Sequence, residues 1–87
     1  MATATEQVEA PVHPTPRQVG DEIRAWAGRR DIPQTQLAEA LGVHPATLNR
    51  KLKGTAPMGL DEISIMCDRL GVPVSQLMKE AEAHAHQ

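Results

Sequence analysis

The chain contains one helix-breaking sequence twice, and this repetition constrains its fold more than any other feature. Leu-Gly-Val stands at residues 41–43 and again at residues 70–72, with helix-like sequence on both sides of each copy. Glycine reaches the left-handed backbone conformation that ends a helix at little cost. We therefore expect two pairs of helices. Each pair is joined by a connection of about three residues, which forces a steep crossing between the two helices.

Apolar residues recur with helical spacing in five segments, so the sequence predicts an all-α domain of five short helices. The expected inward faces are Val19, Ile23, Trp26 and Ala27; Leu37, Ala38 and Leu41; Leu48 and Leu52; Leu60, Ile63, Met66, Cys67 and Leu70; and Val74, Leu77, Met78 and Ala81. With one Trp and no Phe or Tyr, the core must be aliphatic. The lone Cys67 falls within this pattern, where we expect it to be a small buried hydrophobe.

Proline and glycine positions set the expected helix ends. Pro33 and Pro45 each suit the first turn of a helix, where the missing N–H costs nothing. His44 precedes the helix at residues 45–53, and because histidine is a poor capping residue we expect that helix to fray at its start. Gly42, Gly54 and Gly71 are expected to end helices.

Composition divides the chain into three parts. Residues 1–16 are rich in proline and small polar residues and predict a disordered arm; residues 17–80 form the domain, and residues 81–87 a frayed tail. No apolar run approaches the roughly 20 residues of a membrane span, and the start lacks a signal-peptide core. We expect a cytoplasmic protein without membrane contact, associated with the nucleoid, or with the host cytoplasm if phage-encoded.

Charge is distributed unevenly along the chain. The net charge is −2, yet residues 17–54 hold seven Lys or Arg against four acids, a balance of +3. Residues 55–87 hold two against five, a balance of −3, and the remaining two acids are Glu6 and Glu9. The basic half suits a polyanion such as nucleic acid.

The helix at residues 45–53 concentrates residues suited to DNA. Its outward face is predicted to hold His44, Ala46, Asn49, Arg50 and Lys53. Asn pairs bidentately with adenine and Arg with guanine in the major groove, whereas lysines such as Lys51 and Lys53 suit phosphates. The second helix pair carries three acids in residues 61–70, so we expect a packing corner there rather than a second DNA-binding face.

The run "IPQTQLAEALGVHPATLNRKLKG", followed by "GLDEISIMCDRLGVPVSQL", resembles the Cro/CI-type (XRE-type) helix-turn-helix family of phage repressors and bacterial regulators. The resemblance covers roughly residues 18–78. It implies a compact, lambda-repressor-like DNA-binding domain whose helix-turn-helix is formed by the second and third helices. The sequence departs from the family at Pro33 and His44, where Ser or Thr is usual.

The resemblance also implies site residues. It implies base contacts at Pro45, Ala46, Asn49 and Arg50 and phosphate contacts at Gln34, Lys53 and Thr55. From the residues themselves we add Thr47 and Lys51 as phosphate contacts, and also His44, for which a solvated cap position stays equally open. Pro45 cannot hydrogen-bond a base, and Ala46 offers only apolar contact, for instance to a thymine methyl. For Arg29 and Arg30, phosphate contact and simple solvation both stay open.

The leading hypothesis is a sequence-specific regulator of double-stranded DNA, most simply a small repressor of phage or prophage type. The expected operator is an imperfect palindrome, bound by a weak or DNA-induced homodimer. The alternative is an antitoxin-like or other protein-interaction module, with a protein partner on the acidic C-terminal half. The sequence shows no nucleophile–base spacing or phosphate-binding loop. We therefore expect no enzyme activity, cofactor or metal site, the four histidines included.

Overall fold

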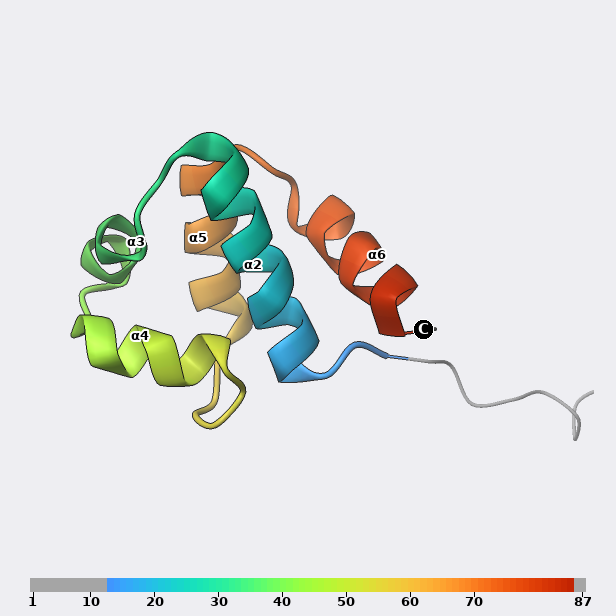
Figure 1. Ribbon diagram of the computed structural model, residues 1–87, viewed down its shortest axis with the longest axis horizontal. Helices are drawn as coiled ribbons and strands as arrows, with labels where there is room; N and C mark the ends of the chain where they lie inside the picture. The colour runs from blue at the N-terminus through green and yellow to red at the C-terminus, as the bar shows by residue number, and fades with distance from the viewer. Residues whose placement is uncertain (1–12, 86–87) are drawn as a thin grey trace, which may run out of the picture.

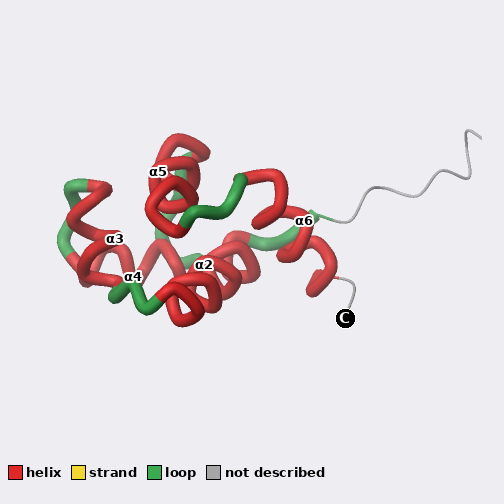
Figure 2. The backbone as a smooth tube through the Cα atoms, turned by 90° about the horizontal axis from the view of Figure 1, so that it is seen from above, coloured by secondary structure: helices red, strands yellow, loops and turns green. Residues whose placement is uncertain are grey.

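Five helices and no strands make up residues 13–85, the part of the chain that the computed structural model describes. In chain order they are α2 (Pro16–Arg30), α3 (Gln34–Leu41), α4 (Pro45–Leu52), α5 (Leu60–Leu70) and α6 (Val74–Ala85). Helices α2 and α5 lie at the centre, with α3 and α4 together on one side and α6 on the other (Figures 1 and 2). The predicted all-α fold is confirmed.

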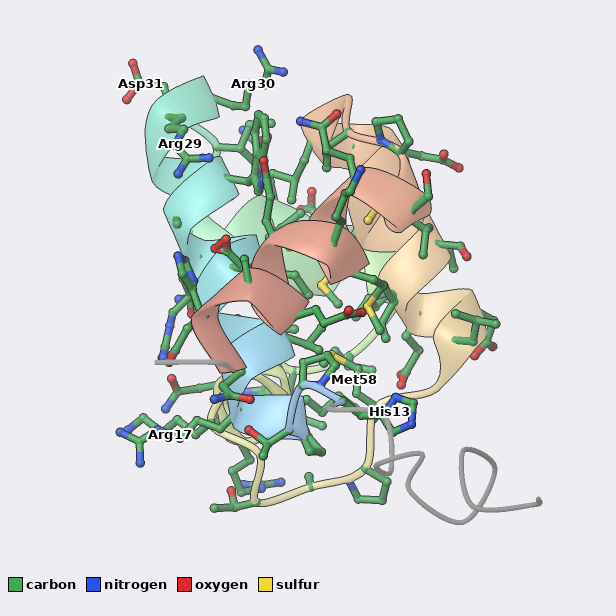
Figure 3. All side chains as sticks on the ribbon, turned by 90° about the vertical axis from the view of Figure 1, so that its right-hand side faces the viewer. His13, Arg17, Arg29, Arg30, Asp31 and Met58 are labelled. Atoms are coloured by element: carbon green, nitrogen blue, oxygen red, sulfur yellow. The ribbon has the colours of Figure 1, made fainter. Side chains whose placement is uncertain are left out.

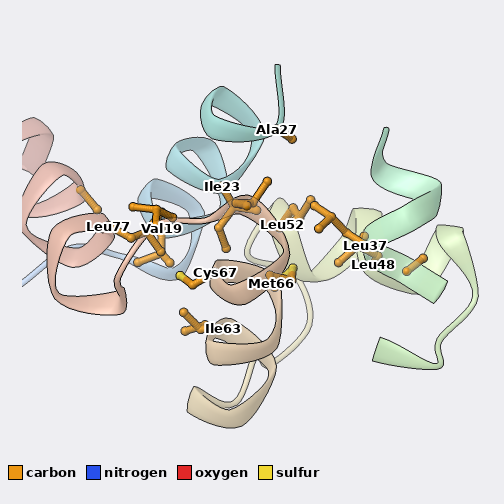
Figure 4. Close-up of a cluster of buried hydrophobic side chains, with 14 residues drawn as sticks. Val19, Ile23, Ala27, Leu37, Leu48, Leu52, Ile63, Met66, Cys67 and Leu77 are labelled. Carbon is orange, nitrogen blue, oxygen red and sulfur yellow. The ribbon is translucent and has the colours of Figure 1, made fainter. Parts of the chain in front are cut away.

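The core is aliphatic and draws on every helix (Figure 4). Its fully enclosed members include Ile23 of α2, Leu37 of α3, Leu48 and Leu52 of α4 and Leu77 of α6. Cys67 is 2% exposed, as the apolar pattern predicted, and burial raises the pKa of its thiol. Five short helices thus share one core, so none of them needs to be stable alone.

Leu60 is the one predicted core residue that the structure places in solvent. It is 66% exposed, whereas Ile63, one turn later, is buried. Leu60 is the first residue of α5, and the packed face of that helix begins only at Ile63. The prediction was wrong because helical periodicity continues to the end of a helix, while packing against neighbouring helices does not.

Both predicted domain ends need correction. Thr15 caps α2: its Oγ1 accepts the Gln18 N–H at 3.1 Å, and the Gln18 Oε1 accepts the Thr15 N–H at 2.8 Å. The ordered fold therefore begins before residue 17. At the other end α6 continues to Ala85 with Ala81 fully buried, so residues 81–85 do not form the predicted frayed tail. Residues 1–12 and 86–87 of the predicted arm and tail lie outside the described residues.

Helix α6 is held antiparallel on α2 by two polar contacts, one helical turn apart. The Trp26 Nε1–H donates to the Glu80 Oε1 at 2.7 Å, and the His84 Nδ1 lies 3.6 Å from the Glu22 Oε2. Trp26 is half-buried and packs against the core through the rest of its ring. The Trp26 ring packs on the core, while its N–H is satisfied by Glu80 at the edge, so one side chain joins α2 to α6 by both kinds of contact.

The second Leu-Gly-Val copy forms the corner between α5 and α6. Gly71 has a φ of 71°, and the buried Val72 donates its N–H to the Cys67 carbonyl at 3.1 Å. A left-handed glycine followed by this backward hydrogen bond is the usual way to end a helix sharply. The turn directs α6 back across α2, the scaffold role expected from its acidic surroundings.

Helices α2 and α4 touch backbone to backbone. A Cβ built on Gly20 would lie 1.9 Å from the Leu52 carbonyl oxygen, so only glycine permits this approach. A second close contact lies nearby, where a Cβ on Gly54 would be 3.0 Å from the Arg17 nitrogen. The last turn of α4 is therefore fixed against the first turns of α2.

None of the helices within residues 13–85 has both the length and the apolar character needed to span a membrane.

Gly20→Ala should destabilise the domain, and Gly28→Ala is its matched control on the same helix. The added methyl of the first variant meets the backbone of α4, and overpacking of this kind costs about 1–3 kcal/mol or more. At Gly28 nothing lies within 4 Å. Alanine there should stabilise by about 0.5–1 kcal/mol, because glycine is a poor helix former. Urea unfolding of both variants tests this; a Gly20→Ala protein as stable as wild type would contradict the close contact.

Candidate nucleic-acid interface

The connection between α3 and α4 is a three-residue turn, residues 42–44, that ends one helix and starts the next. Gly42 is left-handed with a φ of 70°, and Val43 donates its N–H to the Ala38 carbonyl at 3.0 Å. Val43 is half-buried against the core, which fixes the turn from inside. The predicted stop at Gly42 is confirmed. Pro33, however, is the residue before α3 rather than part of its first turn.

His44 caps α4, contrary to the expected fraying. Its Nδ1 accepts the Ala46 N–H at 3.1 Å, and its extended backbone is the usual one for a cap. When Nδ1 accepts this hydrogen bond, Nε2 is the ring's donor. Propensity tables rank histidine low at this position, but they do not record this ring geometry. The start of α4 is thus formed and exposed.

The outward face of α4 carries three of the four predicted base contacts. Pro45, Ala46 and Arg50 are exposed, whereas Asn49 is half-buried. Leu48 and Leu52 anchor the opposite face in the core. The Arg50 Nη2 lies 3.4 Å from the Thr47 Oγ1, a long hydrogen bond that leaves the guanidinium accessible. The exposed turns of α4 therefore present one long cation beside small side chains.

The predicted phosphate contacts lie at the ends of the two helices. Gln34 is the first residue of α3, a helix start with no side-chain cap. Such a start has free N–H groups and a partial positive charge that favour an anion. Lys53 and Thr55 follow α4 and are both exposed. The Thr55 hydroxyl donates to the Arg50 carbonyl at 3.1 Å, which ties this segment to the end of α4.

Lys51 makes contacts within the domain that the sequence did not predict, while its phosphate contact stays a prediction. Its Nζ donates to the Pro57 carbonyl at 2.9 Å and pairs with the Glu62 carboxylate at 3.2 Å. The Glu62 Oε1 in turn accepts the Gly59 N–H at 2.9 Å. These bonds hold the loop between α4 and α5, so the ammonium is committed within the domain. Charge alone suggested a phosphate contact, because sequence does not show that this lysine faces Glu62.

Two cations that the sequence prediction left unassigned join this surface. Arg17 and Arg24 are seven residues apart, so they lie on the same face of α2. Together with Lys53 and Thr55 they line a shared hollow. The sequence hinted at them only through the net charge of +3 in residues 17–54, which includes both arginines but does not show where they lie. Within residues 13–85, no three His, Cys, Asp or Glu side chains gather as a metal site would require.

Arg29 and Arg30 are placed differently, at the other end of α2 (Figure 3). Their guanidinium carbons lie 4.8 and 5.0 Å from the centre of the Trp26 ring, and the Arg30 Nε donates to the Leu70 carbonyl at 3.0 Å. Stacking on the ring is a favourable cation–π contact. Arg30 thus also links α2 to the end of α5, and both arginines remain exposed, so solvation and phosphate contact both stay open.

Comparison with known proteins identifies this arrangement. Residues 18–78 match the helix-turn-helix domain family. The chain belongs to the helix-turn-helix domain family. This agrees with the XRE-type resemblance seen in the sequence and with the span of residues that carried it. None of the curated proteins compared by sequence matches the chain.

Two solved structures resemble this helix-turn-helix domain, and both are of the clp gene regulator ClgR from Corynebacterium glutamicum. One is 24% identical with a TM-score of 0.77 and covers 85% of this chain and 80% of that chain. The other is 26% identical with a TM-score of 0.71 and covers 86% of this chain and 96% of that chain. The likeness thus extends over most of this chain.

Glu62→Gln should remove part of the domain's pH dependence. The Gly59 amide, with a further contribution from Lys51, holds the pKa of the Glu62 carboxyl below its ordinary value of 4.5. A lowered folded-state pKa stabilises the fold above the unfolded value, and this stabilisation is lost as pH falls through the folded pKa.

We therefore expect Glu62→Gln to be about 1 kcal/mol less stable than wild type near neutral pH, the usual contribution of such a bond. The difference should shrink below pH 4.5. Urea unfolding across this range measures it, with the exposed Glu82→Gln as control. A difference independent of pH would contradict the assigned role of the Glu62 charge.

Proposed function

We propose that this protein is a sequence-specific transcriptional regulator that reads the major groove of double-stranded DNA with α4. The carrying observation is the geometry of that helix: an eight-residue helix anchored by Leu48 and Leu52 presents a cationic outward face. Family membership supports the proposal, because the helix-turn-helix places its second helix in the major groove. Both similar solved structures are of a gene regulator.

Base reading is assigned to the exposed turns of α4. Arg50 suits a guanine, because its two-pronged donor matches the O6 and N7 acceptors. Pro45 and Ala46 offer small apolar surfaces that let the helix approach the groove closely, and Ala46 suits a thymine methyl. Asn49, half-buried, is a secondary candidate for an adenine edge. The preference is therefore expected to rest most strongly on Arg50.

Phosphate contacts are assigned to the flanks of α4. Gln34 and the uncapped start of α3 suit a phosphate on one side, and Lys53 and Thr55 on the other. His44 and Thr47 lie between them; the His44 ring presents a donor at Nε2 when Nδ1 accepts the cap bond. Lys51 is left out because its ammonium pairs with Glu62. Such contacts set the register of the helix on DNA.

The simplest form of this function is a small repressor of phage or prophage type, which occludes a promoter by binding within it. A regulator of this kind works in the cytoplasm, where the chromosome lies. A protein partner is the second candidate, antitoxin-like in type. Leu60 is 66% and Ile65 39% exposed on the acidic helix α5, and this gives such a partner an apolar foothold.

Arg50→Ala should weaken binding to the preferred site by about 1–3 kcal/mol and relax the preference at one G·C pair. Selection of bound sites from random DNA, followed by competition gel shifts, measures both effects. Lys79→Ala on α6, away from α4, is the control. Equal losses on preferred and random DNA would assign Arg50 to a phosphate instead. No binding to any DNA at low salt would favour the protein-interaction module.

The protein should be a monomer or weak dimer in solution that pairs on an imperfect palindrome. One short helix reads few base pairs, and proteins of this type gain specificity from two half-sites one helical turn apart. Leu77 and Ala81 of α6 are fully buried within the chain, so they are not free for an interface. Analytical ultracentrifugation with and without DNA tests this. A tight dimer without DNA, or one-to-one binding to an asymmetric site, would contradict it.

A further inference from the structure

Two arginines of α2 and two residues of the segment after α4 line a basic hollow. Its volume is ≈ 340 Å³, and Arg17, Arg24, Lys53 and Thr55 line it. We call these four residues the α2–α4 basic hollow. Arg17, labelled in Figure 3, lies at one end of α2, whereas Arg29 and Arg30 lie at the other end. Three of the four lining residues are cations, although the chain as a whole carries a net charge of −2.

The backbone contacts between the two helices create this hollow. Gly20 lets α2 meet the Leu52 carbonyl, and Gly54, left-handed at a φ of 81°, lies against the Arg17 nitrogen. Lys53 and Thr55 flank that glycine in sequence, so the same contact brings both beside Arg17. The cations thus converge because the backbones are fixed, not because the side chains attract one another.

The electrostatics of the hollow favour an anion. Three positive charges at close range raise one another's energy unless a negative charge approaches. Asp21 pairs with Arg24 and offsets only one of them. Thr15 accepts the Gln18 N–H, and its carbonyl takes the Val19 N–H. The Arg17 N–H has no such bond among residues 13–85, as is usual for the first turn of a helix.

We propose that the α2–α4 basic hollow binds a backbone phosphate of DNA that flanks the bases read by α4. This rests on the proposed function and adds Arg17 and Arg24 to its phosphate contacts. The hollow is larger than one phosphate, and Arg17, Lys53 and Thr55 are exposed, which suits a passing strand more than an enclosed small ion. Lys53 and Thr55 directly follow α4, so the strand beside the groove that α4 enters is the nearest phosphate source.

The salt dependence of DNA affinity tests the hollow directly. Each phosphate contact contributes about 0.9 to the slope of log affinity against log salt concentration. Arg17→Gln and Arg24→Gln should each lower that slope by up to about this amount and weaken binding up to roughly eightfold at 0.1 M salt, equally on preferred and random DNA. Arg69→Gln, an exposed arginine on α5, is the matched control. Asp21→Asn should strengthen binding, because it frees Arg24.

Replacing single DNA phosphates by a neutral methylphosphonate locates the phosphate that the hollow binds. At one position beside the bases read by α4, the replacement should weaken DNA binding of the wild type but not of the Arg17→Gln, Arg24→Gln double variant. If Arg17→Gln and Arg24→Gln show the same salt slopes and affinities as Arg69→Gln, while Arg50→Ala still binds more weakly, the hollow does not bind a phosphate of DNA. The proposed function would then stand without it. Failure of wild type to bind any DNA would overturn both.

A titration with inorganic phosphate distinguishes a phosphate of the DNA backbone from a free phosphate ion as the ligand of the hollow. Nuclear magnetic resonance shifts of Lys53 and Thr55 with phosphate alone, together with unchanged DNA binding of the double variant, would make the ligand a free phosphate and overturn the DNA assignment. Circular dichroism of each variant confirms that these exposed changes leave the fold intact.

Discussion

The contact between Gly20 and the Leu52 carbonyl is the constraint on which the proposed DNA-binding surface depends. Helix α4 has only eight residues and is too short to be stable in isolation. Its orientation must therefore come from neighbours, and the closest is the backbone of α2. Because backbone meets backbone there, no flexible side chain separates the two helices. This contact limits how far α4 can shift or tilt against α2. It therefore also fixes the position on α4 from which Arg50 extends.

The repeated Leu-Gly-Val turn serves two purposes in the same fold. Its first copy directs α4 outward, with Gly42 reversing the chain and His44 starting the new helix. Its second copy, at Gly71 and Val72, folds α6 back onto α2. The turn geometry is nearly the same, with φ values of 70° and 71° at the two glycines. What differs is the next helix: α4 exposes its cationic face, whereas α6 buries Leu77 and Ala81.

Periodicity predicted the five helices and nearly all of the core, because burial in a small all-α domain follows helical spacing. It failed at Leu60, where the spacing continues beyond the end of packing. The polar contacts were less predictable. Lys51 joins Glu62, eleven residues away, and Trp26 joins Glu80, fifty-four residues away. Such pairs depend on how helices cross, which a linear pattern does not contain.

The candidate site was predictable as a helix but not as a surface. The Leu-Gly-Val turn and the exposure of Arg50 followed from sequence, whereas Asn49 is half-buried; the base contact of Arg50 stays a prediction. Arg17 lies thirty-six residues before Lys53, and their proximity follows only from the Gly20 and Gly54 contacts. A glycine in the first turns of an amphipathic helix is the one sequence signal for such an approach. It marks a close contact without naming the partner.

The uneven charge has a physical consequence for specificity. A protein that is basic on every side is attracted to DNA in many orientations, and those bound states compete with the productive one. Here α5 and α6 together carry five acids against two cations, whereas most cations lie on α2 and at α4, so the attraction is uneven. Long-range attraction is correspondingly weak at a net charge of −2. Under the proposed function, discrimination then comes from short-range contacts, and the close backbone contact of α4 with α2 fixes the helix that carries Arg50.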